Sequence, residues 1–147
     1  PNSEIYSCSR VIHSVSLNGG EDFAVVKLDR PVTNHQPLTY RSSGAPQVGE
    51  SLVVMGHPSG LPLKIAGGAH IREIKDSYFT ANLDTYGGNS GSAVFGADTE
   101  ILEGVLVRGE IDFEMKNGCY VSHQCTDGGC RGEQATLMSK ILPYLNP

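Results

Sequence analysis

The sequence has few charged residues and no cluster of basic ones. Asp, Glu, Lys and Arg make up 18% of the 147 residues, and the net charge is −5. Lys and Arg never form a cluster of more than two neighbours. Proteins that bind nucleic acids or anionic membranes usually concentrate positive charge on one surface. The composition therefore argues against a nucleic-acid or membrane partner.

Long apolar runs are also missing. Residues 52–55, one of the longest runs, match the length of a buried strand and are far too short to cross a bilayer. The sequence contains no recognisable signal peptide and opens on Pro1 rather than Met. We therefore expect a processed or truncated product.

Aromatic residues are scarce at 7%, whereas glycine (18 residues) and proline (8 residues) are frequent. Such a composition is typical of an all-β protein with many turns. Alternating apolar and β-branched residues predict strands at residues 5–14, 23–28, 51–56, 69–74, 78–83, 92–95, 101–108 and 119–122.

Two further segments complete the expected architecture. Three prolines in residues 30–46 indicate a linker that crosses between two parts of the molecule. Near the end, apolar residues recur at steps of three and four and predict a closing helix: Ala135, Met138, Ile141, Leu142 and Leu145. Many short strands and one terminal helix favour a β-barrel.

The chain has only four cysteines: Cys8, Cys119, Cys125 and Cys130. An even number in a glycine-rich β chain favours disulfides and an exported protein. Three pairings are possible, and the spacing does not choose between them. Cys8 is far from the others and could instead pair with a segment outside this chain.

The last three cysteines and His123 have the composition of a Cys₃His zinc site. Their spacing is unusual for zinc, and the flanking residues resemble an ordinary loop. We therefore expect a local disulfide among these cysteines, and no metal or organic cofactor.

Residues 87–94, Gly-Gly-Asn-Ser-Gly-Ser-Ala-Val, place a serine in a glycine-rich turn before an apolar strand. A serine hydroxyl is a weak nucleophile that needs a base and a polarised carbonyl. Glycine allows the backbone to approach a substrate closely. The N–H groups of Gly88 and Ser90 could then form an oxyanion hole. Taken alone, the motif fits a plain hairpin turn equally well.

Asp22 opens the apolar segment Asp-Phe-Ala-Val-Val-Lys-Leu. A carboxylate there is costly unless it is hydrogen-bonded, and a histidine N–H is a natural partner. The alternative is that Asp22 simply ends the preceding glycine turn.

Together, the Asp22 and Ser90 motifs resemble those of the chymotrypsin-like serine peptidases. The resemblance is closest to their bacterial branch, the V8-like glutamyl endopeptidases. Digestive trypsins carry Asp at the position of Asn89 and Gly at that of Ser92. Residues 104–109 resemble the family strand that holds an extended substrate.

The resemblance implies a chymotrypsin-like Greek-key β-barrel with a C-terminal helix. It also implies a secreted or periplasmic serine endopeptidase that acts on peptides or proteins without a cofactor. Ser90 would be the nucleophile, Asp22 the orienting acid, and the Gly88 and Ser90 amides the oxyanion hole. Residues 1–42 would be the last strands of a first barrel and a linker, and residues 43–147 the second barrel with its helix.

The resemblance also exposes a missing part. The family histidine lies in a Thr-Ala-(Ala/Gly)-His-Cys-like segment before the aspartate, and this chain has no such segment. None of its five histidines has a suitable context: His13, His35, His57, His70 and His123. We expect the base on an upstream segment or N-terminal fragment, so that this chain alone is inactive. The alternative is an incomplete homologue that binds peptides without cutting them.

Cues to cleavage specificity conflict. In the family, the residues six and five before the nucleophile line the primary pocket, and here they are Asp84 and Thr85. The acid favours basic substrate side chains, whereas the threonine is a feature of glutamyl enzymes. Leu106 stands where those enzymes place a histidine, so we favour basic side chains.

Three residues of the later strand complete the expected substrate-binding set: Val107, Arg108 and Gly109. Arg108 could bind an anion or form a salt bridge with Asp84. It could equally lie over the barrel surface without a binding role.

Overall fold

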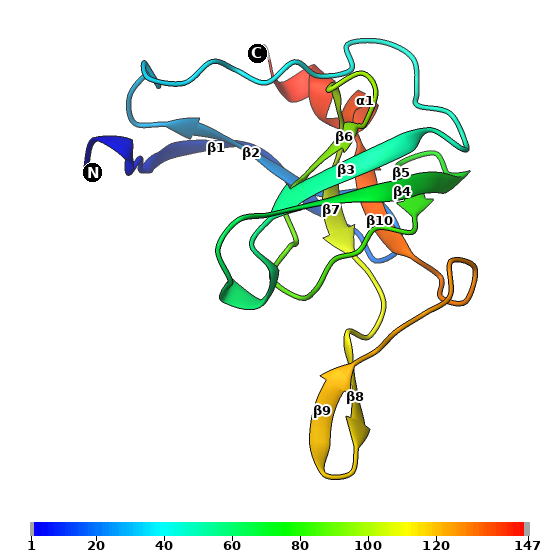
Figure 1. Ribbon diagram of the computed structural model, residues 1–147. Coiled ribbons are helices and arrows are strands. Elements are labelled where there is room, and N and C mark those ends of the chain that lie inside the picture. The colour runs from blue at the N-terminus through cyan, green and yellow to red at the C-terminus, as the bar shows by residue number, and fades with distance from the viewer. Residues whose placement is uncertain (1, 146–147) are drawn as a thin grey trace.

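The computed structural model describes residues 2–145, which form mainly antiparallel strands (Figure 1). The strands are β1 (Cys8–Ser16), β2 (Asp22–Leu28), β3 (Ser51–Gly56), β4 (Lys64–Ile74), β5 (Tyr78–Ala81), β6 (Ala93–Gly96), β7 (Leu102–Arg108), β8 (Phe113–Lys116), β9 (Cys119–Ser122) and β10 (Glu133–Leu137). The helical segments are η1 (Asn2–Glu4), η2 (Pro58–Gly60), α1 (Met138–Ile141) and η3 (Leu142–Tyr144).

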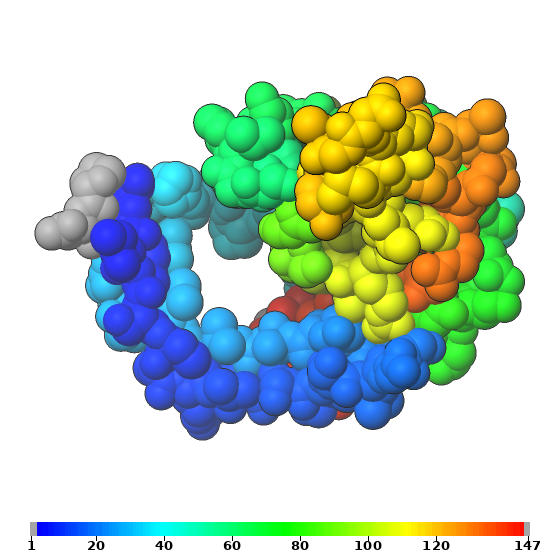
Figure 2. Space-filling model, turned by 90° about the horizontal axis from the view of Figure 1, so that it is seen from below, coloured from blue at the N-terminus to red at the C-terminus, as the bar shows by residue number. Residues whose placement is uncertain are grey.

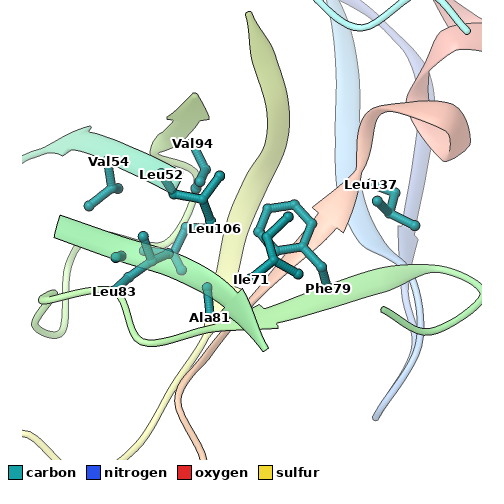
Figure 3. Packing of buried hydrophobic residues seen from close by; sticks show 11 residues of the cluster. Leu52, Val54, Ile71, Phe79, Ala81, Leu83, Val94, Leu106 and Leu137 are labelled. Carbon is teal, nitrogen blue, oxygen red and sulfur yellow. The ribbon is translucent and has the colours of Figure 1, made fainter. Parts of the chain in front are cut away.

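Six strands close into a barrel in the order β10-β5-β4-β3-β6-β7. Every neighbouring pair is antiparallel. Alternate side chains point inward because successive residues of a strand face opposite sides. The buried core includes Leu52, Ile71, Phe79 and Val94, each 0% exposed, and Figure 3 shows these side chains converging from different strands. The barrel and terminal helix predicted from the sequence are therefore confirmed.

Strands β1 and β2 form a separate two-stranded sheet beside the barrel (Figure 1). Phe23 joins it to the C-terminal helix by packing with Met138 and Ile141 in a second apolar cluster. The segment between β2 and β3 contains one isolated bridge, Tyr40 to Leu102, and otherwise no strand or helix. The linker predicted around residues 30–46 falls within this segment.

The linker is attached to the barrel by a buried ion pair. Arg41 donates to Glu103 on β7 at 2.9 Å, and the Glu103 side chain is completely buried. Arg41 also contacts Glu50 at 3.3 Å. Buried charges require such partners, because an isolated carboxylate is very costly to desolvate.

The closing helix was predicted to begin too early in the chain. Residues 133–137 form strand β10 rather than the start of a helix, and the α-helix begins only at Met138. The spacing from Ala135 onward has a helical period, but β10 is required to join β5 to β7 and close the barrel. Tertiary pairing therefore overrides the local pattern.

Strands β8 and β9 form a hairpin that projects away from the barrel (Figure 1). Its turn uses Asn117 and Gly118, both with positive φ, as the Asn-Gly sequence predicts. The sequence reasoning missed β8, whose four residues lie on an exposed arm. Within residues 2–145, no helix has the length and hydrophobicity needed to span a bilayer.

Candidate active site

Ser90 lies in the turn between β5 and β6, exposed at the barrel surface. Gly88 and Gly91, on either side of it, have φ values of +96° and +90°. L-residues with side chains rarely adopt this region, so the glycines permit the turn. The Ser90 hydroxyl donates to the Val107 carbonyl of β7 at 3.0 Å. The turn therefore holds the hydroxyl against the strand expected to bind substrate.

The backbone of this turn is supported from one side by η2. The Ser59 N–H donates to the Gly87 carbonyl at 2.7 Å. A Cβ at Gly88 would lie only 3.2 Å from the Ser59 nitrogen. In the described part of the chain, the N–H groups of Gly88 and Ser90 have no protein acceptor. These two donors are the pair that the sequence predicts for the oxyanion hole.

A second support comes from the segment after β7. The Asp112 carboxylate accepts the Gly87 N–H at 2.6 Å. Tyr86 places its hydroxyl 2.5 Å from that of Ser122 and its ring 5.5 Å from that of Phe113. The projecting hairpin is thus tied to the turn that carries Ser90. Sequence reasoning missed Asp112 and Tyr86, since their role depends on contacts across the fold.

Asn89 turns inward and is 5% exposed. Its Oδ1 atom has no hydrogen-bond partner among residues 2–145. The atom lies so close to Gly56 that a Cβ there would approach it to 2.4 Å. Glycine at the end of β3 therefore makes room for the buried amide.

Asp22 and Ser90 line the same large groove, whose volume is about 1030 Å³. Figure 2 shows the corresponding opening between the blue β1–β2 hairpin, the light-blue linker and the barrel. Several exposed apolar side chains line this groove, among them Val26 and Leu38. The fold thus brings the two predicted residues to one surface.

The backbone of Asp22 is fixed by Thr136 of β10. The Thr136 hydroxyl donates to the Asp22 carbonyl at 3.0 Å, and the Asp22 N–H donates to the Thr136 hydroxyl oxygen at 3.4 Å. The half-buried Asp22 carboxylate has no hydrogen bond or ion pair within residues 2–145. It remains able to orient another group.

None of the five histidines lines the groove or the small pocket beside Ser90. His13 stacks on Tyr144 with ring centroids 3.8 Å apart. His57 places Nδ1 3.1 Å from the Leu61 carbonyl, and His35 lies 3.5 Å from Glu4. The positions of His70, on β4, and His123, after β9, are likewise outside both spaces.

Ser90 also lines a small side pocket of about 70 Å³. Of the residues predicted to bind substrate, Thr85, Arg108 and Gly109 line this side pocket, whereas Asp84 does not. Asp84 is exposed and lines an adjoining outer cavity of about 450 Å³. Arg108 donates to the Gly20 carbonyl at 3.0 Å and forms no ion pair with Asp84 in the described structure.

The side pocket contains a carboxylate that sequence reasoning missed. Glu133 of β10 lines both the side pocket and the outer cavity. Burial raises the pKa of Glu133 to about 7, and the negative charges of Asp112 and Glu110 add to this effect. The Glu110 N–H, 3.5 Å from Oε1, opposes it. A helix was expected from Ala135 onward, so residue spacing did not indicate that Glu133 would reach this pocket from a strand.

Cys125 and Cys130 form a disulfide, which confirms the local bridge expected among the last three cysteines. In the described residues, Cys8 and Cys119 are unpaired and exposed. The sulfur atoms of the bridge lie within 4.8 Å of a His123 nitrogen. Disulfide sulfurs are not thiolates, and thiolate is the form of cysteine that binds metal.

Comparison with known proteins identifies the family. The model for the trypsin-like peptidase domain matches residues 5–102, about two thirds of the chain, which include Asp22 and Ser90. A search of curated proteins gives no match. Solved structures give many matches.

Two solved structures illustrate the likeness in fold. The active form of the Rv3671c protease from M. tuberculosis has a TM-score of 0.62 and 20% identity, over 90% of this chain and 56% of that one. A kallikrein-related peptidase 10 complex with Zn2+ has a TM-score of 0.67 and 16% identity, over 98% of this chain and 72% of that one. The chain thus spans little more than half of the mycobacterial protein. Its sequence and fold together place it in the trypsin-like peptidase domain family.

Proposed function

We propose that this chain carries the nucleophile of a serine endopeptidase. The observation that carries the proposal is the turn around Ser90, where Ser90 is exposed and two backbone N–H groups have no acceptor among residues 2–145. Ser90 attacks the scissile carbonyl and forms an acyl-enzyme, while the Gly88 and Ser90 N–H groups stabilise the oxyanion. Water then releases the acyl group.

The proton of Ser90 must pass to a base. We assign this role to a histidine supplied by a segment upstream of residue 1 or by an N-terminal fragment. The unpaired Asp22 carboxylate in the groove shared with Ser90 supports this assignment. Asp22 would accept the histidine N–H, fix the ring and stabilise its protonated form.

The large groove supports the proposed division of the protein. Residues 1–42 would belong to a first barrel and a linker, and residues 43–147 to the second barrel. The separate β1–β2 sheet and the exposed apolar residues of the groove are consistent with a missing neighbour. Asn89 and Ser92 favour the V8-like branch of the family, and the disulfide favours a secreted or periplasmic enzyme.

The substrate would lie extended along the end of β7. Val107, Arg108 and Gly109 follow each other at the edge of the turn, and the Val107 carbonyl already accepts the Ser90 hydroxyl. Backbone hydrogen bonds to this strand would hold a peptide by β-addition. The scissile carbonyl would then face Ser90.

Peptide hydrolysis by the full-length protein that contains this sequence tests the proposal. Ser90→Ala should lower kcat by about 10⁶-fold, because it removes the nucleophile. Asp22→Asn should lower kcat by about 10⁴-fold, because it stabilises the wrong histidine tautomer. Retained hydrolysis in Ser90→Ala would contradict the proposal.

A second candidate function is that of a homologue that binds peptides without catalysis. Among the described residues, no histidine lines the groove or the side pocket, and this favours the second candidate. Calorimetry with uncut peptides would then show binding by the full-length protein, with no product after long incubation. Hydrolysis that depends on Ser90 would exclude this candidate.

A further inference from the structure

The side pocket beside Ser90 contains one glutamate that the proposed chemistry does not use. The side chain of Glu133 leaves β10 and lies directly over Gly109 at the end of β7. A Cβ at Gly109 would fall 1.3 Å from Glu133 Oε2. The carboxylate therefore occupies space that only a glycine at position 109 provides.

The charged groups around Glu133 have other partners. Glu110 accepts a hydrogen bond from the Arg131 side chain at 2.7 Å, and Asp112 accepts one from the Gly87 N–H at 2.6 Å. Arg108 is directed to the Gly20 carbonyl and to Gln134. Within residues 2–145, Glu133 forms no ion pair. Its carboxylate accepts hydrogen bonds from the Thr85 side chain and the Glu110 N–H, and it can still pair with a cationic ligand.

The surroundings of Glu133 are strongly acidic. The side pocket and the outer cavity have five lining residues in common, so they adjoin along one wall. The outer cavity is lined by one arginine, Arg72, and by five residues with carboxylates: Asp84, Glu110, Asp112, Asp127 and Glu133. Arg72 is partly engaged by the Cys130 carbonyl at 2.8 Å. A positive group in this space would gain attraction from several sides.

We propose that Glu133 is the specificity-determining residue of this site and selects substrates with arginine or lysine before the scissile bond. The inference rests on the proposed function, which places the scissile carbonyl at Ser90. A guanidinium or ammonium group in the side pocket would pair with Glu133 and reduce its repulsion with Asp112. Asp84, at the outer cavity, would contact only a side chain that reaches beyond Glu133.

The protonation of Glu133 gives the selection a dependence on pH. Burial raises its pKa to about 7, so it is largely neutral in mildly acidic solution and charged in mildly alkaline solution. The facing charged or titratable groups are Asp112 and Glu110 after β7, Arg108 on β7, Arg131 before β10 and His123 after β9. Binding of a cation should therefore strengthen as the pH rises through this range.

The role of Glu133 is tested by measuring the binding of p-aminobenzamidine to the full-length protein through the fluorescence of the probe. This probe carries an amidinium group, which resembles the end of arginine. Glu133→Gln should weaken binding by about tenfold or more at alkaline pH, because a hydrogen bond between charged groups is lost. The matched change Glu73→Gln, at an exposed glutamate paired with Lys75, should leave binding unchanged.

Asp84→Asn should weaken binding less than Glu133→Gln does. The pH dependence of the unaltered protein is a measurement that no folding defect of a variant can affect. Its affinity for p-aminobenzamidine should rise between about pH 6 and about pH 8, because Glu133 becomes charged. Glu133→Gln should remove most of that rise. Equal affinity of Glu133→Gln and the unaltered protein, a larger loss in Asp84→Asn, or no binding by the unaltered protein would overturn the proposal.

The probe needs neither the nucleophile nor the histidine. Ser90→Ala should therefore bind p-aminobenzamidine like the unaltered protein. If peptide hydrolysis fails while binding still depends on Glu133, the proposed function is wrong and the acidic pocket stands. If hydrolysis depends on Ser90 but shows no preference for basic residues, only the role of Glu133 is wrong.

Discussion

Gly88 combines two demands that no other residue type meets. Its φ is +96°, and a Cβ would lie 3.2 Å from the Ser59 nitrogen and 3.3 Å from the His57 carbonyl oxygen. Gly88→Ala should therefore move the turn and displace one proposed oxyanion donor. We expect kcat of the full-length protein to fall by about 10²- to 10³-fold, as for loss of one such donor.

Gly44→Ala is the matched control for that prediction. Gly44 also has a positive φ, +69°, but a Cβ there would meet nothing within 4 Å. It should lower stability slightly, by about 1 kcal/mol, and leave kcat unchanged. Equal loss of kcat in the two variants would show that the effect comes from folding and not from the donor.

Glu133 should also make stability depend on pH. Its pKa in the folded protein is about 7, above the ordinary value of 4.5. The folded state thus binds this proton more tightly, so the associated stability is fully present below the unfolded pKa and is lost as the pH rises through about 7. Urea unfolding of Glu133→Gln should show less loss of stability over this range. A pH dependence identical to that of the unaltered protein would contradict the assigned burial.

At the scale of residues, prediction from sequence succeeds where the signal is local. The turn around Ser90 is recognisable because its glycines and its following strand are consecutive. Glu133 and Asp112 were missed because they reach the site from β10 and from the segment before β8. Their spacing from Ser90 in the sequence carries no information about that contact.

The linker and the barrel are joined by a buried ion pair between Arg41 and Glu103. Arg41→Ala would leave the completely buried Glu103 carboxylate without its main partner. We expect the free energy of unfolding to fall by about 3–5 kcal/mol, as for other broken buried pairs. Urea denaturation monitored by circular dichroism measures this loss.

The double variant Arg41→Met/Glu103→Leu distinguishes pairing from packing. It removes both charges and keeps apolar volume, so its stability should lie well above that of Arg41→Ala. A double variant as unstable as Arg41→Ala would show that the ion pair is not the source of the effect.

At the scale of elements, periodicity predicted most strands of the barrel but not the last one. Residues 133–137 carry a pattern that also fits a helix, and their strand state depends on pairing with both β5 and β7. The β8–β9 hairpin was only half predicted, from its Asn-Gly turn and β9. Its position is set by Tyr86 and Asp112, which connect it to the turn before Ser90.

The whole molecule consists of a closed barrel with a second, two-stranded sheet beside it. The barrel is closed, so each of its strands pairs on both sides. The apolar groove between the barrel, the β1–β2 hairpin and the linker remains open (Figure 2). The division into a first-barrel remnant with a linker and a second barrel stays a prediction, made from the prolines of the linker and from the family resemblance. The source of the catalytic base could not be predicted from residue spacing, because none of the five histidines has the sequence context of the family histidine.

We propose that Ser90 is a nucleophile activated by a histidine outside residues 1–147. Treatment with a fluorophosphonate probe, followed by mass-spectrometric mapping of the modified residue, tests this most directly. We predict that the full-length protein is modified at Ser90, and that residues 1–147 alone are modified far more slowly. Modification of residues 1–147 alone at the rate of the full-length protein, or no modification at Ser90 in either, would contradict it.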